Sequence, residues 1–269
     1  MDKLIGKVDV LGCPITNLSL DDFVNRAERF ISSKTPHYIA MMNVAKLIKM
    51  RSDEELAQSI LTADLIGADG VPLVWASRLL GRSLPGRVNG TDLMYKLLEK
   101  GNEKGYRIFF FGADEDVLER ILRKVRVEYP GINIAGFHHG YFDATEELKV
   151  AHEIRQSQAD ILFIAFGSPK KELWVKQYFH VMGVPVIHGV GGSFDVMAGI
   201  VPRAPLWMQK SGVEWLFRLL QEPRRMWRRY LFTNILFVLL LFREWLRLHF
   251  SVVERQRRRR EVPRQKEAK

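Results

Sequence analysis

Short apolar runs alternate with amphipathic stretches along most of this chain, and this alternation constrains its fold more than any other feature. The runs at residues 37–43, 107–111 and 160–166 are continuously apolar, which is typical of strands covered on both faces. The stretches between them carry apolar residues at helical spacing. Alternating strands and helices predict an α/β fold, with a Rossmann-like, largely parallel sheet and helices on both of its faces.

The predicted elements cover most of residues 7–190. Strands are expected at residues 7–11, 37–43, 63–66, 107–111, 132–137, 160–166 and 185–190. Helices are expected at residues 20–32, 44–61, 72–80, 91–100, 114–128, 145–156 and 170–181.

Composition excludes several classes of protein. With 47% hydrophobic and 27% charged residues, the chain is neither disordered nor collagen-like. Its one cysteine, Cys13, excludes an intramolecular disulfide, and the first residues lack the pattern of a signal peptide. A reducing, cytosolic compartment is therefore expected.

The basic residues are unevenly distributed. Residues 203–269 hold 17 basic and 6 acidic side chains, whereas the rest of the chain holds 24 and 25. Such a boundary indicates a body and an appendage with a different partner. We expect an α/β body at residues 1–202, a helical, membrane-facing appendage at 203–254 and a basic tail without fixed structure at 255–269.

Glycine-bearing or polar turns follow the predicted strands. Ligands of parallel α/β sheets bind beyond the carboxyl ends of the strands, and glycines let the backbone approach a phosphate. These turns hold Asn43, Asp69, Gly112, Gly167, Lys171, Glu172, Gly191, Gly192, Ser193 and Asp195. None is a P-loop or a complete dinucleotide fingerprint. For any one turn alone, a tight strand-to-helix connection is the favoured interpretation.

Asp69 follows an apolar run and precedes Gly70 and Pro72, a residue suited to the first turn of a helix. Its carboxylate could act as a general base, or it could cap the helix that follows. Position alone favours the cap. Asp195 has the same ambiguity, with a ribose or sugar hydroxyl as its functional partner.

Several motifs together resemble one family. They are ADGVP at residues 68–72, RVNGTDLM at 87–94, GSPKKE at 167–172, GVGGSFD at 189–195, RAP at 203–205, and the residues EW, RL and EPRR between 214 and 225. In this order the set resembles the WecG/TagA/CpsF glycosyltransferase family, and the similarity runs from about residue 43 to residue 230.

The resemblance implies an inverting glycosyltransferase of cell-envelope polysaccharide synthesis. Such an enzyme moves a sugar from a UDP-sugar to an undecaprenyl-diphosphate-linked sugar, at the cytoplasmic face of the membrane and without an obligatory metal or other cofactor. N-acetylmannosamine is the implied donor sugar, and a uronic acid or glucose donor stays open. The polymer, the linkage and any homo-oligomer also stay open.

The same resemblance implies roles for individual residues. Asp69 matches the catalytic base, and Asn43 and Arg87 match polar positions of its pocket. Arginines of the appendage would close over the site; they are Arg218, Arg225 and Arg228. Two positions depart from the family pattern: Met41 stands where threonine is usual, and Lys171 where glutamine is usual.

The residues agree with metal-free chemistry. No Asp-x-Asp pair ends an apolar strand, and the acidic residues 114–116 are typical of the first turn of a helix. A clamp for the leaving diphosphate could be built from Arg87, Lys171 and the appendage arginines. His138 and His139 lack the spacing of metal ligands.

The appendage contains an apolar run at residues 230–242, flanked by Arg228 and Arg243. A transmembrane helix needs about 20 apolar residues, so this run is too short. It predicts a helix lying in the interface of an anionic membrane, reinforced by the arginines at 257–260. The alternative is a helix packed on the body or on a second subunit.

Nucleic-acid binding is an alternative function from a different class. The basic tail could bind nucleic acid non-specifically on a nucleotide-binding α/β protein. Its basic residues interleave with a long apolar stretch, which suits lipid better, so no nucleic-acid partner is expected. An oxidoreductase would need a dinucleotide fingerprint that is missing.

Overall fold

The computed structural model of the 269-residue chain describes residues 6–221 and 223–261. Side chains are described throughout these ranges except at positions 210, 218, 225, 226, 228–230 and 251–261.

A six-stranded sheet forms the centre of the body, and its strand order is β4-β3-β8-β7-β5-β6. Every pairing in it is parallel, which confirms the predicted fold class. Its strands are β3 (Tyr38–Met42), β4 (Leu65–Ala68), β5 (Arg107–Gly112), β6 (Asn133–His138), β7 (Ile161–Ala165) and β8 (Val186–Gly189).

The predicted strand at residues 7–11 forms outside this sheet. It is β1 (Lys7–Val10), which pairs antiparallel with β2 (Cys13–Thr16) in a separate hairpin. Leu11 and Gly12 form the turn, both with positive φ. The sequence analysis missed β2, because a four-residue strand that contains a proline carries little periodic signal.

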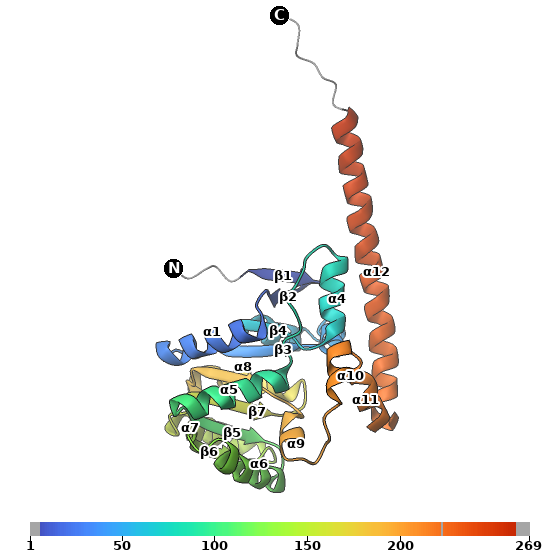
Figure 1. The fold of residues 1–269 in the computed structure, drawn as a ribbon. Coiled ribbons are helices and arrows are strands. Elements are labelled where there is room, and N and C mark those ends of the chain that lie inside the picture. Colours follow the sequence, from blue (N-terminus) through green and yellow to red (C-terminus); the bar gives the residue numbers. More distant parts are fainter. Residues whose placement is uncertain (1–5, 222, 262–269) are drawn as a thin grey trace, which may run out of the picture.

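Helices cover both faces of the sheet (Figure 1). Along β5, Phe109 and Phe111 belong to one apolar core, and Ile108 and Phe110 to the other, as the alternation of strand side chains requires. One face carries α1 (Leu20–Ser33), α5 (Gly90–Lys104), α6 (Glu115–Glu128) and α9 (Ser193–Met197). The other carries α2 (Val44–Lys49), α3 (Glu54–Leu61), α4 (Val71–Leu79), α7 (Glu147–Gln156) and α8 (Lys170–Met182).

The single helix predicted at residues 44–61 is two helices. α2 ends at Lys49, and α3 begins after Asp53, whose Oδ1 accepts a hydrogen bond from Leu56 N at 2.9 Å. This cap gives the chain a new helix start and accounts for the break.

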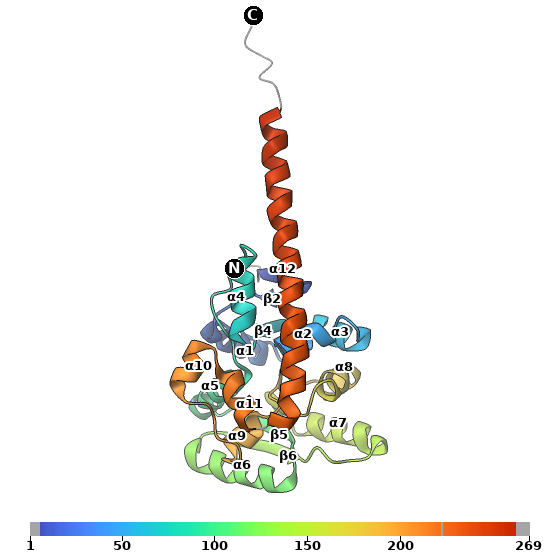
Figure 2. The same ribbon diagram turned by 90° about the vertical axis from the view of Figure 1, so that its right-hand side faces the viewer.

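The last part of the described chain is helical. α10 (Leu206–Ser211) and α11 (Glu214–Gln221) precede α12 (Pro223–Glu261), which starts at a proline, a residue tolerated in the first turn of a helix. α12 runs beside α2 and continues beyond the body (Figures 1 and 2). It also extends past residue 254, into the segment predicted to be an unstructured tail; residues 262–269 lie outside the described residues.

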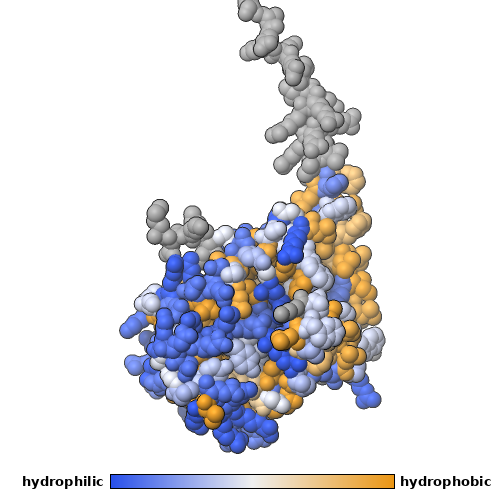
Figure 3. Space-filling model, viewed as in Figure 1, coloured by the Kyte–Doolittle hydropathy of each residue, from blue (hydrophilic) through white to orange (hydrophobic). Residues whose placement is uncertain are grey.

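α12 has one packed side and one exposed side. Phe237 is only 5% exposed, and Leu241 and Trp245 also pack on the core of the body. Figure 3 shows apolar side chains gathered along the outer side of the same helix. Exposed apolar residues of α12 include Leu231, Phe232, Ile235, Leu236, Val238, Leu239, Phe242 and Phe250. Over the described residues, every helix is too short or too polar to cross a membrane.

Gly212 brings the appendage close to the body. It lies between α10 and α11 with φ +78°, and a Cβ added there would come within 2.8 Å of Val71 Cβ. Only glycine combines this backbone conformation with so close a contact. The appendage thereby reaches the start of α4, next to Asp69.

Candidate active site

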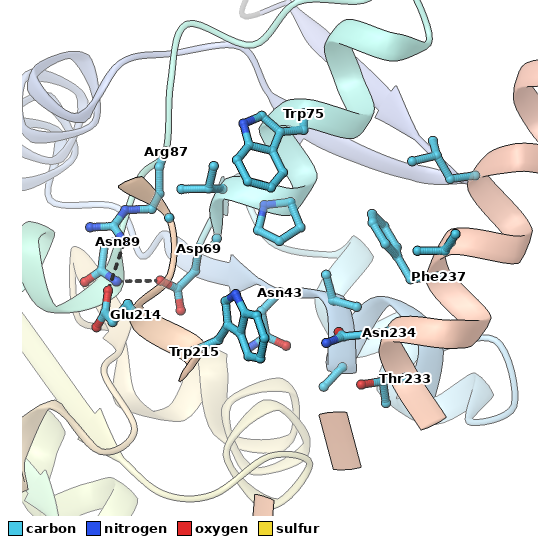
Figure 4. Close-up of a pocket in the computed structure, with 18 residues that line it drawn as sticks. Asn43, Asp69, Trp75, Arg87, Asn89, Glu214, Trp215, Thr233, Asn234 and Phe237 are labelled. Atoms are coloured by element: carbon cyan, nitrogen blue, oxygen red, sulfur yellow. Dashed lines mark hydrogen bonds and ion pairs between the residues drawn. The ribbon is translucent and has the colours of Figure 1, made fainter. Parts of the chain in front are cut away.

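A cavity of about 450 Å³ opens at the carboxyl ends of β3 and β4 (Figure 4). The strand ends of the body supply its floor. Its walls are α4 of the body and α11 and α12 of the appendage. Its polar lining residues are Asn43, Asp69, Arg87, Asn89, Glu214, Thr233 and Asn234. Its apolar lining includes Val71, Pro72, Trp75, Trp215, Phe237, Val238 and Leu241. The three residues predicted to be catalytic, Asn43, Asp69 and Arg87, therefore share one cavity.

Asp69 presents its carboxylate to this cavity (Figure 4). Asn89 Nδ2 donates a hydrogen bond to Asp69 Oδ1 at 2.9 Å. α4 begins after Gly70, and no described side chain caps it. Gly70 therefore stands at the cap position of α4, and Asp69 turns its carboxylate to the cavity; its role as a base stays a prediction.

Asn89 and Asn43 line the cavity, and each also starts a helix. Asn89 Oδ1 accepts from the backbone nitrogens of Thr91 and Asp92, at 2.9 and 3.2 Å, and so caps α5. Asn43 Oδ1 accepts from Lys46 N at 3.0 Å and caps α2. Both amides are held by their helix starts, so their orientation in the cavity is fixed.

Arg87 lies at the edge of the cavity between two carboxylates. Its Nη1 donates to Glu214 Oε2 at 2.9 Å, and its Nη2 lies 3.5 Å from Asp92 Oδ2. Asp92 Oδ1 in turn accepts from Arg203 Nη2. The guanidinium of Arg87 is thus oriented by one residue of the body and one of α11.

A buried charge cluster lies behind the cavity. Lys46 Nζ is 2.7 Å from Glu172 Oε1 and donates to Met41 O at 2.8 Å, and Lys171 Nζ is 3.6 Å from Glu172 Oε1. All three side chains are nearly inaccessible to solvent. Lys171 and Glu172 therefore lie outside the lining of the cavity.

The cluster shifts the pKa values of its members. Burial lowers the pKa of Lys171 to about 8, helped by the charge of Lys46 and opposed by the charges of Glu172 and Asp69. Burial alone would raise the pKa of Glu172, but the two ammonium groups outweigh it and hold that pKa at about 2. The cluster with all three groups ionised carries one net positive charge, which favours an anionic ligand nearby.

The predicted glycine turns lie farther along the same sheet edge, because β5, β7 and β8 run parallel to β3. Gly112 ends β5 against the backbone of Ala165, and Gly167 follows β7. Gly191, Gly192, Ser193 and Asp195 follow β8 and start α9.

Ser193 has a structural environment. It is buried, its Oγ donates to Val190 O at 2.8 Å, and it shares a hydrogen bond of the same length with Thr91 Oγ1. None of the predicted residues in the turns after β5, β7 and β8 lines the cavity described above.

The appendage arginines are placed by their backbone alone. Arg218 lies in α11, and Arg225 and Arg228 lie in the first turns of α12. Their side chains lie outside the described part of the structure. No cluster of three or more His, Cys, Asp or Glu side chains that could hold a metal ion occurs within the described residues.

Several residues of the site were missed in the sequence analysis as functional positions. Asn89, Glu214 and Trp215 lie within the quoted motifs, and this was the available signal. Trp75 and Phe237 carry no motif, and only the packing of α4 and α12 around the cavity brings them to it.

Comparison with known proteins identifies relatives over most of the chain. The family described as "Glycosyl transferase WecG/TagA/CpsF family" matches residues 8–251. A Bacillus spizizenii protein named N-acetylglucosaminyldiphosphoundecaprenol N-acetyl-beta-D-mannosaminyltransferase is 41% identical over 230 residues, which cover 85% of this chain and 86% of that protein.

Two further relatives have the same name. The Bacillus subtilis protein is 35% identical over 219 residues, which cover 81% of this chain and 84% of that protein. The Staphylococcus aureus protein is 31% identical over 224 residues, which cover 82% and 87%.

Proposed function

Because the chain belongs to the WecG/TagA/CpsF family of glycosyltransferases, we propose that it transfers N-acetylmannosamine from a UDP-sugar to N-acetylglucosamine on undecaprenyl diphosphate. The names of its relatives support this acceptor and this transferred sugar. The product would serve the synthesis of a cell-envelope polymer.

One observation carries the mechanism: the carboxylate of Asp69 faces the cavity and accepts a hydrogen bond from Asn89. In inverting transfer, a base removes the proton of the acceptor hydroxyl while that oxygen attacks the anomeric carbon of the donor. The bond from that carbon to the diphosphate breaks, and UDP leaves. Asp69 is proposed as the base, with the acceptor sugar in the cavity.

The donor is proposed to bind along the glycine turns after β5, β7 and β8. Lys171 lies beneath the last of these turns. A Cβ on Gly189 would meet Lys171 Cδ and Cε at 2.6 Å, and one on Gly191 would lie 3.9 Å from Lys171 Nζ. The ammonium of Lys171 is thus close to the backbone that would hold the diphosphate, and its positive charge would stabilise the departing UDP without a metal.

The appendage is proposed to be a membrane-facing lid. Its α11 and α12 complete the walls of the cavity, and the exposed apolar side of α12 suits the interface of a bilayer. The lipid chain of the acceptor would leave the cavity along the apolar wall of Trp75, Phe237 and Val238. The acceptor diphosphate would then meet Arg225 and Arg228 at headgroup depth.

The direct test is release of UDP. The full chain is incubated with undecaprenyl-diphosphate N-acetylglucosamine in anionic vesicles and with UDP-sugars in parallel, namely UDP-N-acetylmannosamine, its uronic acid and UDP-glucose. We expect acceptor-dependent UDP release with UDP-N-acetylmannosamine. Release with the uronic acid alone would reassign the donor, and no acceptor-dependent release with any donor would contradict the proposed function.

A further inference from the structure

Four charged side chains form a continuous series at the junction of body and appendage. Glu214 accepts from Arg87 at 2.9 Å, Arg87 lies 3.5 Å from Asp92, and Asp92 accepts from Arg203. Arg87 and Asp92 belong to the body. Arg203 and Glu214 belong to the segment that follows residue 202, so the series joins the two parts twice.

The two links differ in what they can do for the cavity. Glu214 and Arg87 both line it, whereas Arg203 is outside its lining. The side chains of Arg87 and Glu214 are 17% and 13% exposed, and those of Arg203 and Asp92 are 24% and 30% exposed. The Arg87–Glu214 pair is therefore the better shielded from solvent, and its attraction is the less screened.

We propose that Glu214 is a positioning residue, through which α11 holds the Arg87 guanidinium in its working orientation beside the Asn89–Asp69 pair. This inference rests on the proposed function, since it assigns Arg87 a role in transfer. In this role Glu214 acts through Arg87.

The geometry explains why Arg87 needs such a partner. An arginine side chain has many rotamers, and ordering it opposes binding through the loss of conformational entropy. Asp92 alone holds it at 3.5 Å, which is longer than a good charge-assisted hydrogen bond. The shorter contact with Glu214 Oε2 is the stronger constraint on the guanidinium. Two carboxylates flank it, so a change of orientation would break at least one of these two contacts.

A competing explanation treats the series only as a tether between body and appendage. In that case, breaking either link would loosen the appendage and reduce transfer to a similar extent. The two links can be broken separately, because each uses a different residue of the appendage.

The test compares four variants with the full wild-type chain, namely Glu214→Gln, Glu214→Asp, Arg203→Gln and Glu28→Gln. Glu214→Gln breaks the link to Arg87 with an isosteric neutral side chain. Arg203→Gln breaks the other link. Glu28→Gln removes an ion pair of similar length, with Lys104 at 2.7 Å, that joins α1 to the last residue of α5; neither residue lines the cavity.

The readouts are kcat, KM for each substrate, and Tm. UDP-N-acetylmannosamine is the donor, and the acceptor is diphosphoryl N-acetylglucosamine on a short, water-soluble prenyl chain without vesicles. We expect Glu214→Gln to lower kcat by about tenfold, since small misplacements of an active-site group have effects of this order. KM for the donor should stay within about twofold, and Glu214→Asp, which keeps the charge, should give an intermediate kcat.

Arg203→Gln and Glu28→Gln should keep kcat within about twofold, because partly exposed ion pairs contribute little. Wild-type kcat in Glu214→Gln would overturn the inference. An equal loss of kcat in Glu214→Gln and Arg203→Gln would overturn it in favour of the tether. An inactive wild-type chain would instead contradict the proposed function, so the two failures are distinguishable.

Discussion

Asn89 Nδ2 donates a 2.9 Å hydrogen bond to Asp69 Oδ1, across 20 residues of sequence. The other end of the same amide caps α5. A single side chain therefore ties the rotation of the carboxylate to the start of a helix. This fixes the orientation of the proposed base before any substrate enters.

Replacing Asp69 by asparagine should remove the base and keep the shape of the side chain. We expect kcat to fall by about a hundredfold or more, since general-base catalysis commonly contributes this much. Affinity for UDP, measured by calorimetry, should change little, because Asp69 is not part of the turns after β5, β7 and β8 that are proposed to hold the donor. Transfer at the wild-type rate in Asp69→Asn would exclude this assignment.

Asn89→Ala should affect both stability and catalysis. Loss of the cap should lower the free energy of unfolding by about 1 kcal/mol, and loss of the hydrogen bond to Asp69 should lower kcat. Asp53→Ala is a matched control, because Asp53 caps α3 and is absent from the lining of the cavity. Urea unfolding should show similar losses of stability in both variants. If both also keep wild-type kcat, Asn89 has only a structural role.

The reduced pKa of Lys171 predicts an alkaline limit to activity. Its folded-state pKa is about 8, against an ordinary value of 10.5. The ammonium is present below about pH 8 and is lost above it, so kcat/KM for the donor should fall as the pH rises through this value. Lys171→Arg should move the decline to higher pH, because arginine stays protonated. A profile that is the same in the wild type, Lys171→Arg and Lys171→Gln would remove Lys171 from the donor site.

Glu172 should contribute stability that is lost in acid. Its pKa is about 2 in the folded protein, against an ordinary value of 4.5. A lowered pKa stabilises the fold above about pH 4.5, and this contribution disappears as the pH falls toward 2. A shift of this size corresponds to about 3 kcal/mol.

Denaturant unfolding at pH 7 and at pH 3 checks this prediction. Glu172→Gln should be less stable than the wild type at pH 7, and the difference should shrink by roughly half at pH 3. Glu28→Gln, which removes a partly exposed carboxylate, is the control. A difference between wild type and Glu172→Gln that is equal at both pH values would contradict the role of the buried cluster.

A chain that ends at Leu206 should separate donor binding from membrane binding. It retains the sheet and the glycine turns, so we expect it to fold and to bind UDP. It lacks the cavity walls from α11 and α12, and it lacks most of the basic excess, so vesicle binding and transfer to the lipid acceptor should be lost. The checks are calorimetry with UDP and co-sedimentation with anionic vesicles. Wild-type sedimentation and transfer would contradict the lid.

Strands buried on both faces were predictable, because their continuous apolar runs are visible locally; Ile161–Ala165 is an example. The break between α2 and α3 was missed, since an apolar pattern continues across it and only the cap at Asp53 ends it. β1 was predicted as a strand, but its partner β2 was missed, because four residues that include a proline carry little periodic signal.

Some contacts of the site could be predicted from the sequence and others could not, for the same reason. Asn43 and Asp69 were predicted to lie near one another, because the carboxyl ends of parallel strands share one edge of the sheet. The pairing of Arg87 with Glu214 spans 127 positions, and no local pattern indicates such a contact. Nor could the sequence decide between capping and catalysis for Asp69, since that depends on which way the carboxylate points.

The pairing of β3 with β8 has a consequence for biosynthesis. Ile39 is the register partner of His188. β3 is therefore synthesised early and pairs with β4, but it can pair with β8 only after most of the body has left the ribosome. At about 5–20 residues per second, this delay lasts on the order of ten seconds. Glu214 and Phe237 emerge later still, so a nascent chain can form the complete cavity only after α12 has been synthesised as far as Leu241.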